Sequence, residues 1–257
     1  MISSIAVIGT GNVAYHLIRH FQYVDPGVKK VFGKTLQSFE KLGGLKGFEK
    51  SLNLSEIGPN EFDLILLAVS DDAIIEIAKN LPDLGETILA HTSGATSIDV
   101  ISAVSKNTGV FYPLQTFSLG TIVDFQKVPI CIEASNKKTE EKLRSFSSSL
   151  GCKSEKVNSD QRKRIHLAAV FANNFTNHLL GVSKEILSES RMELKILEPL
   201  VNETLKKAFE QSPEHSQTGP AKRGDQKTME AHLEMIKDNH IKTLYQILSK
   251  GIIEKYN

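Results

Sequence analysis

The chain has 257 residues, of which 40% are hydrophobic and 24% charged, and its formal net charge is +1. This is the composition of a soluble globular protein, and the balanced charge argues against a nucleic-acid surface or a polybasic membrane patch. The longest apolar runs, such as 64–69, are too short to cross a bilayer, and no signal or transit peptide is visible. Cys131 and Cys152 show neither a metal-ligand nor a CxxC spacing. We therefore expect a cytoplasmic protein.

Residues 1–157 alternate between strand-like and helix-like patterns. The continuous apolar run at 62–71 suits a strand that is buried on both faces. Further strands are predicted at 4–9, 29–34, 87–94, 109–118 and 128–134, with helical patterns between them. Strands that alternate with short helices indicate βαβ units, so we expect an α/β domain with a mostly parallel, Rossmann-like sheet.

From residue 158 to residue 257 the pattern is helical. A long helix is predicted from Asn158 through Ser190, and its apolar middle predicts burial on several sides. A second helix is expected near Pro199, followed by a polar loop at 211–225. The last helix carries apolar residues near helical spacing: Met229, Leu233, Ile236, Leu244 and Ile247. We expect two domains, a nucleotide-binding domain at 1–157 and a helical substrate or dimerisation domain at 158–257.

The segment VIGTGNVAYHL, residues 7–17, carries a GxGxxA pattern. Gly9 permits a tight turn, Gly11 lets a pyrophosphate approach the backbone at the positive end of the next helix, and Ala14 is small enough for helix–strand packing. Because the pattern lies between a predicted strand and a predicted helix, it predicts a dinucleotide site. The residues expected to hold the diphosphate are Gly9, Thr10, Gly11, Asn12 and Val13.

The end of the second predicted strand indicates which dinucleotide is bound. NAD sites usually carry an acidic residue there, whereas this chain has Lys34, Thr35 and Ser38 and no acid before Glu40. A cation and hydroxyls suit the 2′-phosphate of NADP better than a bare ribose. The alternative is an ordinary surface lysine in a loop. We predict NADP(H) as the cofactor.

The sequence gives no support for a P-loop, a metal site or a serine hydrolase. The GKT at 33–35 resembles the tail of a P-loop, but Val28 stands where that motif needs glycine. His16 and His20 have the spacing of a helical metal pair, yet no HExxH motif or third ligand accompanies them. We expect two solvated helix residues there and no metal site. The chain has no GxSxG motif, so serine hydrolase chemistry has no support.

The order of the motifs resembles a known family over essentially the whole chain. After the glycine loop and GKT come LLAVSDDAI (66–74), HTSGATSIDVI (91–101), GVFYPLQTFS (109–118), VPICIEAS (128–135), HLAAVFANNFTNHL (166–179) and TGPAKRGD (218–225). This pattern resembles Rossmann-like NADP oxidoreductases with a helical domain of unknown function, DUF2520, which are distant relatives of pyrroline-5-carboxylate reductase and β-hydroxyacid dehydrogenases. The resemblance implies NADP binding, a dimerising helical domain and an active site between domains, but no substrate.

The resemblance also assigns positions around the cofactor. It implies that Ala68, Val69 and Ser70 touch the adenine and ribose side, with Asp71 and Asp72 nearby. It implies that the loop His91–Gly94, with Thr92 and Ser93, borders the nicotinamide. Pro113, Gln115 and Thr116 are expected at the substrate end.

The long helix departs from the β-hydroxyacid dehydrogenases, which place a lysine and an asparagine one turn apart. Here His166, Asn173 and Asn177 share one stripe, while Asn174 and His178 lie on the neighbouring stripe. Buried amides and an imidazole need partners, supplied either by a polar substrate pocket or by loop backbone and a dimer interface.

The candidate catalytic residues follow from these positions. We expect His166 to donate the proton, with His91 as the second choice, Asn173 and Asn177 to hydrogen-bond the substrate, and Arg223 to bind a carboxylate. His91 can also be a core histidine, and Arg223 can lie in a plain surface turn.

The leading hypothesis is hydride transfer between NADP(H) and a small carbonyl or imine compound. Because the lysine of the relatives is absent, a non-catalytic NADP(H)-binding sensor or subunit is the alternative. Hydride exchange with a deazaflavin is a third option. We expect a homodimer, with no nucleic-acid or membrane partner.

Overall fold

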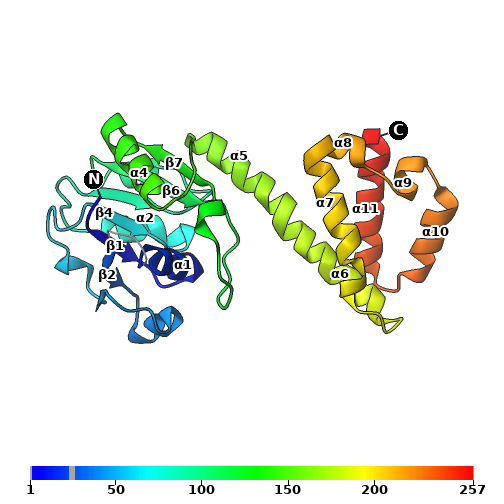
Figure 1. Cartoon of the computed structure of the whole chain (residues 1–257), viewed down its shortest axis with the longest axis horizontal. Coiled ribbons are helices and arrows are strands. Elements are labelled where there is room, and N and C mark those ends of the chain that lie inside the picture. The colour runs from blue at the N-terminus through cyan, green and yellow to red at the C-terminus, as the bar shows by residue number, and fades with distance from the viewer. Residues whose placement is uncertain (1, 23–26, 257) are drawn as a thin grey trace. The chain divides into compact units, whose positions relative to one another are not determined.

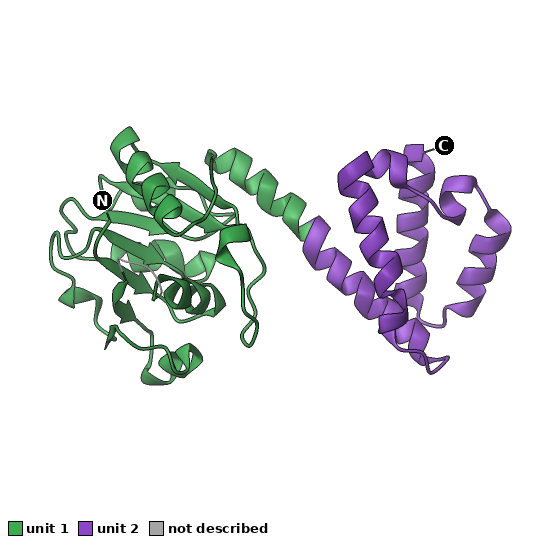
Figure 2. Cartoon of the chain, in the orientation of Figure 1, with its two compact units in different colours: residues 1–170 green, residues 171–257 purple. Residues whose placement is uncertain are grey.

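The computed structural model of the chain describes residues 2–22 and 27–256. It divides into two compact units, Met1–Val170 (unit 1) and Phe171–Asn257 (unit 2), as Figures 1 and 2 show. Within these described residues, every strand belongs to unit 1, and the regular elements of unit 2 are helices. Among the described residues no helix is long and apolar enough to cross a membrane.

Unit 1 is built on one eight-stranded sheet in the order β3-β2-β1-β4-β5-β6-β7-β8. The strands are β1 (Ile5–Ile8), β2 (Val28–Phe32), β3 (Glu49–Ser51), β4 (Leu64–Leu67), β5 (Ile88–His91), β6 (Thr108–Pro113), β7 (Ile130–Ala134) and β8 (Ser154–Lys156). Every neighbouring pair is parallel except β6 and β7, which are antiparallel. The first six strands have the order of a doubly wound dinucleotide-binding fold, which confirms the predicted α/β class.

The alternation of side chains along the central strands builds a core on each face of the sheet. Ile5 and Val7 of β1 face a core that α1 (Asn12–Phe21) and α4 (Lys137–Ser149) cover. Ala6 and Ile8 face a second core, which α2 (Asp71–Lys79) and α3 (Asp99–Ser102) cover. Residues of β1 and β4 are buried throughout, as the continuous apolar runs predict.

The direction of the strands gathers the functional loops at one place. β1, β2, β4, β5 and β6 run parallel, so the loops that follow them meet at the same end of the sheet, called the carboxyl edge below. The chain leaves β1 and β4 through helices on opposite faces, which makes a topological switch point between these two strands.

Some short elements were not predicted. β3 consists of the polar residues Glu-Lys-Ser, which carry no apolar alternation, at the outer end of the sheet. The helical pattern that follows the second predicted strand forms a 3-10 helix, η1 (Leu36–Leu42). Two further 3-10 turns, η2 (Leu54–Glu56) and η3 (Phe125–Lys127), lie in loops.

The long helix begins where the sequence predicts. Asn158 and Gln161 form a capping box at the start of α5 (Ser159–Ala169). A π-helical turn, η4 (Val170–Phe175), and α6 (Thr176–Ser188) continue it. The domain boundary expected at 157/158 coincides with the start of this helix, whereas the compact units divide inside it, after Val170.

The remaining helices belong to unit 2. They are η5 (Leu194–Leu197), α7 (Glu198–Gln211), α8 (Pro213–Ser216), α9 (Pro220–Arg223), α10 (Gln226–Met235) and α11 (Asn239–Tyr256). The helix expected near Pro199 is α7. The polar loop expected at 211–225 contains two one-turn helices, α8 and α9, which both begin with proline.

Two expectations for the helical part are wrong. The predicted last helix is two helices, because Asp238 accepts the backbone N–H groups of His240 and Ile241 and so starts α11 anew. The long helix is not buried on several sides, since Leu167, Phe171 and Phe175 are 46% to 64% exposed. An apolar pattern around a helix does not by itself show that the rest of the same chain covers it.

Candidate nucleotide and catalytic site

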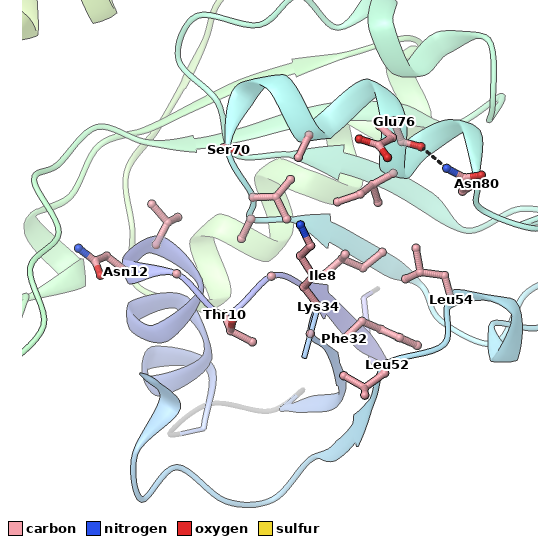
Figure 3. A pocket seen from close by; sticks show the side chains of 18 residues that line it. Ile8, Thr10, Asn12, Phe32, Lys34, Leu52, Leu54, Ser70, Glu76 and Asn80 are labelled. Carbon is pink, nitrogen blue, oxygen red and sulfur yellow. Dashed lines mark hydrogen bonds between the residues drawn. The ribbon is translucent and has the colours of Figure 1, made fainter. Parts of the chain in front are cut away.

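A cavity of about 810 Å³ opens at the carboxyl edge of unit 1, between the loops that follow β1, β2 and β4 (Figure 3). It lies at the switch point, where doubly wound sheets bind their ligands. The structure brings nine of the predicted cofactor residues to its wall: Gly9, Thr10, Gly11, Asn12, Val13, Lys34, Ala68, Val69 and Ser70.

The two glycines of the loop after β1 serve different purposes. Gly9 has φ +124°, and a Cβ there would lie 2.2 Å from the carbonyl oxygen of Ala68, so the fold itself requires glycine. Gly11 is the N-cap of α1 with φ −77°, and a Cβ there would meet nothing within 4 Å. The fold does not require glycine at position 11, so its missing side chain leaves room for a ligand over the backbone.

The amino end of α1 is suited to an anion. No side chain caps it, its first turn has no acidic residue, and Arg19 and His20 occupy its last turn. The free N–H groups and the helix dipole therefore face the cavity without an internal partner of opposite charge. A diphosphate over Gly11 would satisfy them.

Lys34 is the residue at the cavity that suits a 2′-phosphate. Its ammonium points into the cavity in Figure 3, and within the described part of the chain it forms no ion pair. Thr35 and Ser38 do not line the cavity. They form a capping box with each other, in which Ser38 donates its N–H to Thr35 Oγ1 at 3.2 Å and its hydroxyl to the Thr35 carbonyl at 2.6 Å.

The residues on the far wall of the cavity were not predicted from the sequence. Leu52, Leu54 and Ile77 supply apolar surface there, while Glu76 of α2 and Asn80, the residue that follows α2, supply polar groups. Leu52 and Leu54 follow the unpredicted strand β3, and Glu76 lies on the outward face of an ordinary amphipathic helix. The one signal in the sequence is a pair of leucines in an otherwise polar segment, 51–56.

A second group of side chains meets at the carboxyl edge beside Gly94. The Tyr112 hydroxyl of β6 is 3.1 Å from Nδ1 of His166 on α5, and the two rings meet edge to face. Burial, followed by the neighbouring Cys131 and Asp71, raises the pKa of Tyr112 to about 12, against an opposing effect of Arg162. The hydroxyl therefore keeps its proton at neutral pH. The sequence identified His166 but not Tyr112.

His91 ends β5 and is fully buried. The N–H of Ser93 donates to its Nδ1 at 3.2 Å. Burial, followed by the charge of Arg162, lowers the pKa of His91 to about 3, against a smaller opposing effect from the Ser97 backbone. The imidazole is therefore neutral at physiological pH. These surroundings favour the core-histidine alternative over proton donation.

Thr92 and Ser93 are buried and shape the loop after β5 rather than line the cavity. Thr92 donates its hydroxyl to the Leu67 carbonyl at 3.3 Å. The Ser93 hydroxyl accepts the N–H groups of Ala95 and Thr96 at 3.1 and 2.9 Å. Their predicted contact with the cofactor stays a prediction.

Arg162 fastens the first turns of α5 to the sheet. It is fully buried and donates to the Glu133 carboxylate of β7 and to the carbonyl of Thr96. Ser159 donates its N–H and hydroxyl to the same carboxylate, each at 2.9 Å. Sequence reasoning did not find this network, because Arg162 lies in a charged run, QRKR, that looks solvated.

Asn173, Asn177 and Arg223 belong to unit 2. Asn173 lies in the π-helical turn, and both asparagines are exposed. The Arg223 side chain is 64% exposed and lies 3.9 Å from the Asp225 carboxylate. Their roles toward a substrate stay predictions.

His16 and His20 are not the solvated residues expected. His16 is 2% exposed and its Nε2 contacts the Ser118 carbonyl at 3.0 Å. His20 stacks on Phe125 and contacts the Leu150 carbonyl at 3.1 Å through Nε2. The spacing of four residues places both on the face of α1 that the loop after β6 covers. The described residues include no group of three side chains that could hold a metal ion.

Comparison with known proteins places this geometry in a family. Residues 128–252 match the family model described as domain of unknown function DUF2520. A crystal structure from Bacteroides fragilis, described as a candidate NADP oxidoreductase, is 33% identical and covers 98% of both chains with a TM-score of 0.90. This chain belongs to the DUF2520 family.

The fold of this DUF2520 protein extends to more distant reductases. A pyrroline-5-carboxylate reductase from Coxiella burnetii is 14% identical, covers 100% of this chain and 98% of its own, and has a TM-score of 0.61. A reductive aminase from Aspergillus terreus, solved with NADPH and ethyl-5-oxohexanoate, is 10% identical, covers 99% and 95%, and has a TM-score of 0.75. At these identities the likeness concerns the fold. No curated protein matches the sequence.

Proposed function

We propose that this DUF2520 protein binds NADP(H) and transfers a hydride between it and a small carbonyl or imine compound. The observation that carries the proposal is the amino end of α1 at Gly11, where no side chain caps the helix. The fold itself does not require glycine at this position, because a Cβ there would meet no atom within 4 Å. The description of the Bacteroides fragilis relative and the NADPH complex of the Aspergillus terreus enzyme support it.

Groups at the cavity wall of unit 1 suit the diphosphate and the adenosine half of this cofactor. The N–H groups of α1 would hold the diphosphate, Lys34 would pair with the 2′-phosphate, and Leu52, Leu54 and Ile77 would flank the adenine. NADPH, when bound, supplies the hydride. The protein then has to orient the acceptor and supply one proton, which we assign to His166 at the same edge of the sheet.

We further propose that the protein is a homodimer joined through unit 2. Phe171, Leu200 and Phe209 are 64% to 91% exposed, and large apolar side chains of this kind are rarely left in water in such number. A cytoplasmic location, expected from the sequence, stays a prediction.

Replacing Gly11 by alanine tests the nucleotide site. Because a Cβ at this position meets no atom within 4 Å, Gly11→Ala should fold as the wild type does. The methyl group would stand where the diphosphate approaches the backbone, so NADPH affinity should fall on the order of tenfold or more, or about 1.4 kcal/mol. Isothermal titration calorimetry measures the change.

Gly44→Ala is the matched control, since a Cβ there also meets nothing within 4 Å and the residue lies away from the cavity. It should bind NADPH as the wild type does. Equal affinity in Gly11→Ala and Gly44→Ala would contradict the proposed site, and no heat with NADPH or NADH in the wild type would end the proposal.

A further inference from the structure

The hydrogen-bonded side chains of Tyr112 and His166 suggest how the proton is delivered. We propose that these two residues form a proton relay in which the Tyr112 hydroxyl faces the substrate and His166 replaces the proton that it gives away. The inference rests on the proposed hydride transfer and extends it by a catalytic residue that the sequence did not indicate. Three features of unit 1 carry it.

The first feature is the space kept free for the pair. A Cβ at Gly94 would lie 2.7 Å from Nδ1 of His166 and 2.8 Å from Cζ of Tyr112, closer than side chains pack. The backbone of Gly94 is not in the left-handed region, so its conformation does not demand glycine. What requires the missing side chain is the closeness of the two rings. The loop after β5 thus fits around the pair.

The second feature is where the hydroxyl lies. β6 runs parallel to β5, with Val110 opposite His91, so Tyr112 extends beyond the end of β5 toward the carboxyl edge. Asp71, which begins α2, is close enough to raise the pKa of Tyr112. Ser70, the residue before it, lines the nucleotide cavity. Tyr112 therefore lies at the same edge of the sheet as the cavity, near the start of α2.

The third feature is the protonation of Tyr112. With burial as the main cause, its pKa is raised to about 12, so a free tyrosinate is costly at neutral pH. A phenol in this state gives up a proton readily only if another group replaces that proton in the same step. Nδ1 of His166, at 3.1 Å, is placed to do so.

The proposed step gives one hydride and one proton to the substrate. Hydride adds to the carbonyl carbon and the C=O π bond breaks. The proton of the Tyr112 hydroxyl goes to the substrate oxygen, while Nδ1–H of the His166 imidazolium gives its proton to the Tyr112 oxygen. The products are an alcohol, oxidised cofactor and neutral His166, which takes a new proton from solvent. With an imine, nitrogen takes the place of the substrate oxygen.

The chain contains a second pair of the same kind that serves as an internal control. In unit 2 the Tyr245 hydroxyl of α11 lies 2.9 Å from Nδ1 of His232 on α10, and the rings also meet edge to face. Both residues belong to unit 2 and are far along the chain from the nucleotide-binding loops. Tyr245→Phe therefore removes a hydrogen bond of the same kind from residues that have no part in the proposed relay.

The test compares Tyr112→Phe with Tyr245→Phe in two measurements. Nitrogen-15 NMR of the histidine rings, assigned with His166→Gln, should show a changed tautomer population for His166 in Tyr112→Phe alone. Oxidation of NADPH is then followed with a panel of 2-keto acids, aldehydes and cyclic imines. For any compound reduced, Tyr112→Phe should lower kcat on the order of a hundredfold, with KM and NADPH affinity little changed. Tyr245→Phe should match the wild type.

The outcomes separate this inference from the function beneath it. Wild-type kcat in Tyr112→Phe, or an unchanged His166 ring, overturns the relay and leaves hydride transfer standing. NADPH binding without reduction of any compound in the panel overturns both and favours a sensor. No NADPH binding overturns the proposed function itself. Gly94→Ala is the second variant if Tyr112→Phe does not fold, and it should lower kcat while NADPH still binds.

Discussion

Lys34 is the residue on which the choice between NADP and NAD depends. Its ammonium points into the cavity, while Thr35 and Ser38 are occupied with each other. We expect Lys34→Gln to weaken NADPH binding on the order of tenfold and to leave NADH binding unchanged, because only NADPH carries the 2′-phosphate. Calorimetric titration with both nucleotides measures this.

Lys41→Gln is the control for this prediction, since Lys41 is exposed on η1 and does not line the cavity. A loss of affinity that is equal for NADPH and NADH in Lys34→Gln would assign the lysine a general electrostatic role. Unchanged binding of both nucleotides would show that Lys34 is an ordinary surface lysine with no role in binding them.

Single residues were predictable where they belong to a short local motif. Gly9 and Gly11 were found because a tight turn and a helix end have a fixed glycine pattern. Tyr112 and Arg162 were not, because their meaning arises from partners that are 54 and 29 residues away in the sequence. His16 and His20 were misjudged for the same reason: the carbonyl groups that bury them belong to distant loops.

At the scale of elements, the docking of α5 on the sheet places charge beside a neutral histidine. The Arg162 guanidinium on α5 lies near His91 at the end of β5, and burial together with this charge lowers the pKa of His91 to about 3 from an ordinary value of 6.5. Between about pH 3 and pH 6.5, His91 is therefore protonated in the unfolded chain but neutral in the folded chain. Stability from this source is complete above about pH 6.5 and is lost as the pH falls toward 3.

We therefore expect the free energy of unfolding to fall by up to about 1.4 kcal/mol for each pH unit below 6.5 on account of His91. Urea unfolding, followed by circular dichroism from pH 4 to pH 8, measures the slope. His91→Asn should have a shallower slope than the wild type, whereas His240→Gln, which changes an exposed histidine, should not. Identical slopes in the wild type and His91→Asn would contradict a neutral buried His91.

Elements were predicted best where one apolar period runs uninterrupted. β1, β4 and α1 follow directly from such runs, whereas α7 was expected from Pro199 at its start. β3 was missed because a three-residue polar strand at the sheet end has no pattern, and α10 and α11 were merged because the apolar spacing continues across the cap at Asp238. The π-helical turn has no signal in the sequence that simple periodicity detects.

At the scale of the whole molecule, the apolar surface of unit 2 predicts the state of association. The chain has a mass of 28.4 kDa, and we expect light scattering to give twice that value at micromolar concentration. Phe171 and Phe175 contact each other edge to face and are both exposed. Phe171→Asp should shift the mass toward that of a single chain without loss of fold, because it adds charge to a surface that the homodimer would cover.

Lys206→Gln, an exposed substitution on α7, is the control and should leave the mass unchanged. A wild-type protein with the mass of one chain at these concentrations would contradict the proposed homodimer. Phe171→Asp with the wild-type mass would place the contact elsewhere on unit 2.

The reversal of one strand has a consequence for where the reactive group arrives. Because β7 runs opposite to β6 and β8 runs with β7, the chain leaves β8 heading away from the carboxyl edge. The next helix, α5, runs back along the loop after β5. Ser159 contacts Ser97, Arg162 donates to the Thr96 carbonyl, and His166 lies beside Gly94. His166, about two helical turns after Ser159, is the residue of this helix that lies beside Gly94. If β7 and β8 ran parallel to β6, β8 would end at the carboxyl edge. The helix that follows would then start at this edge and carry His166 away from it.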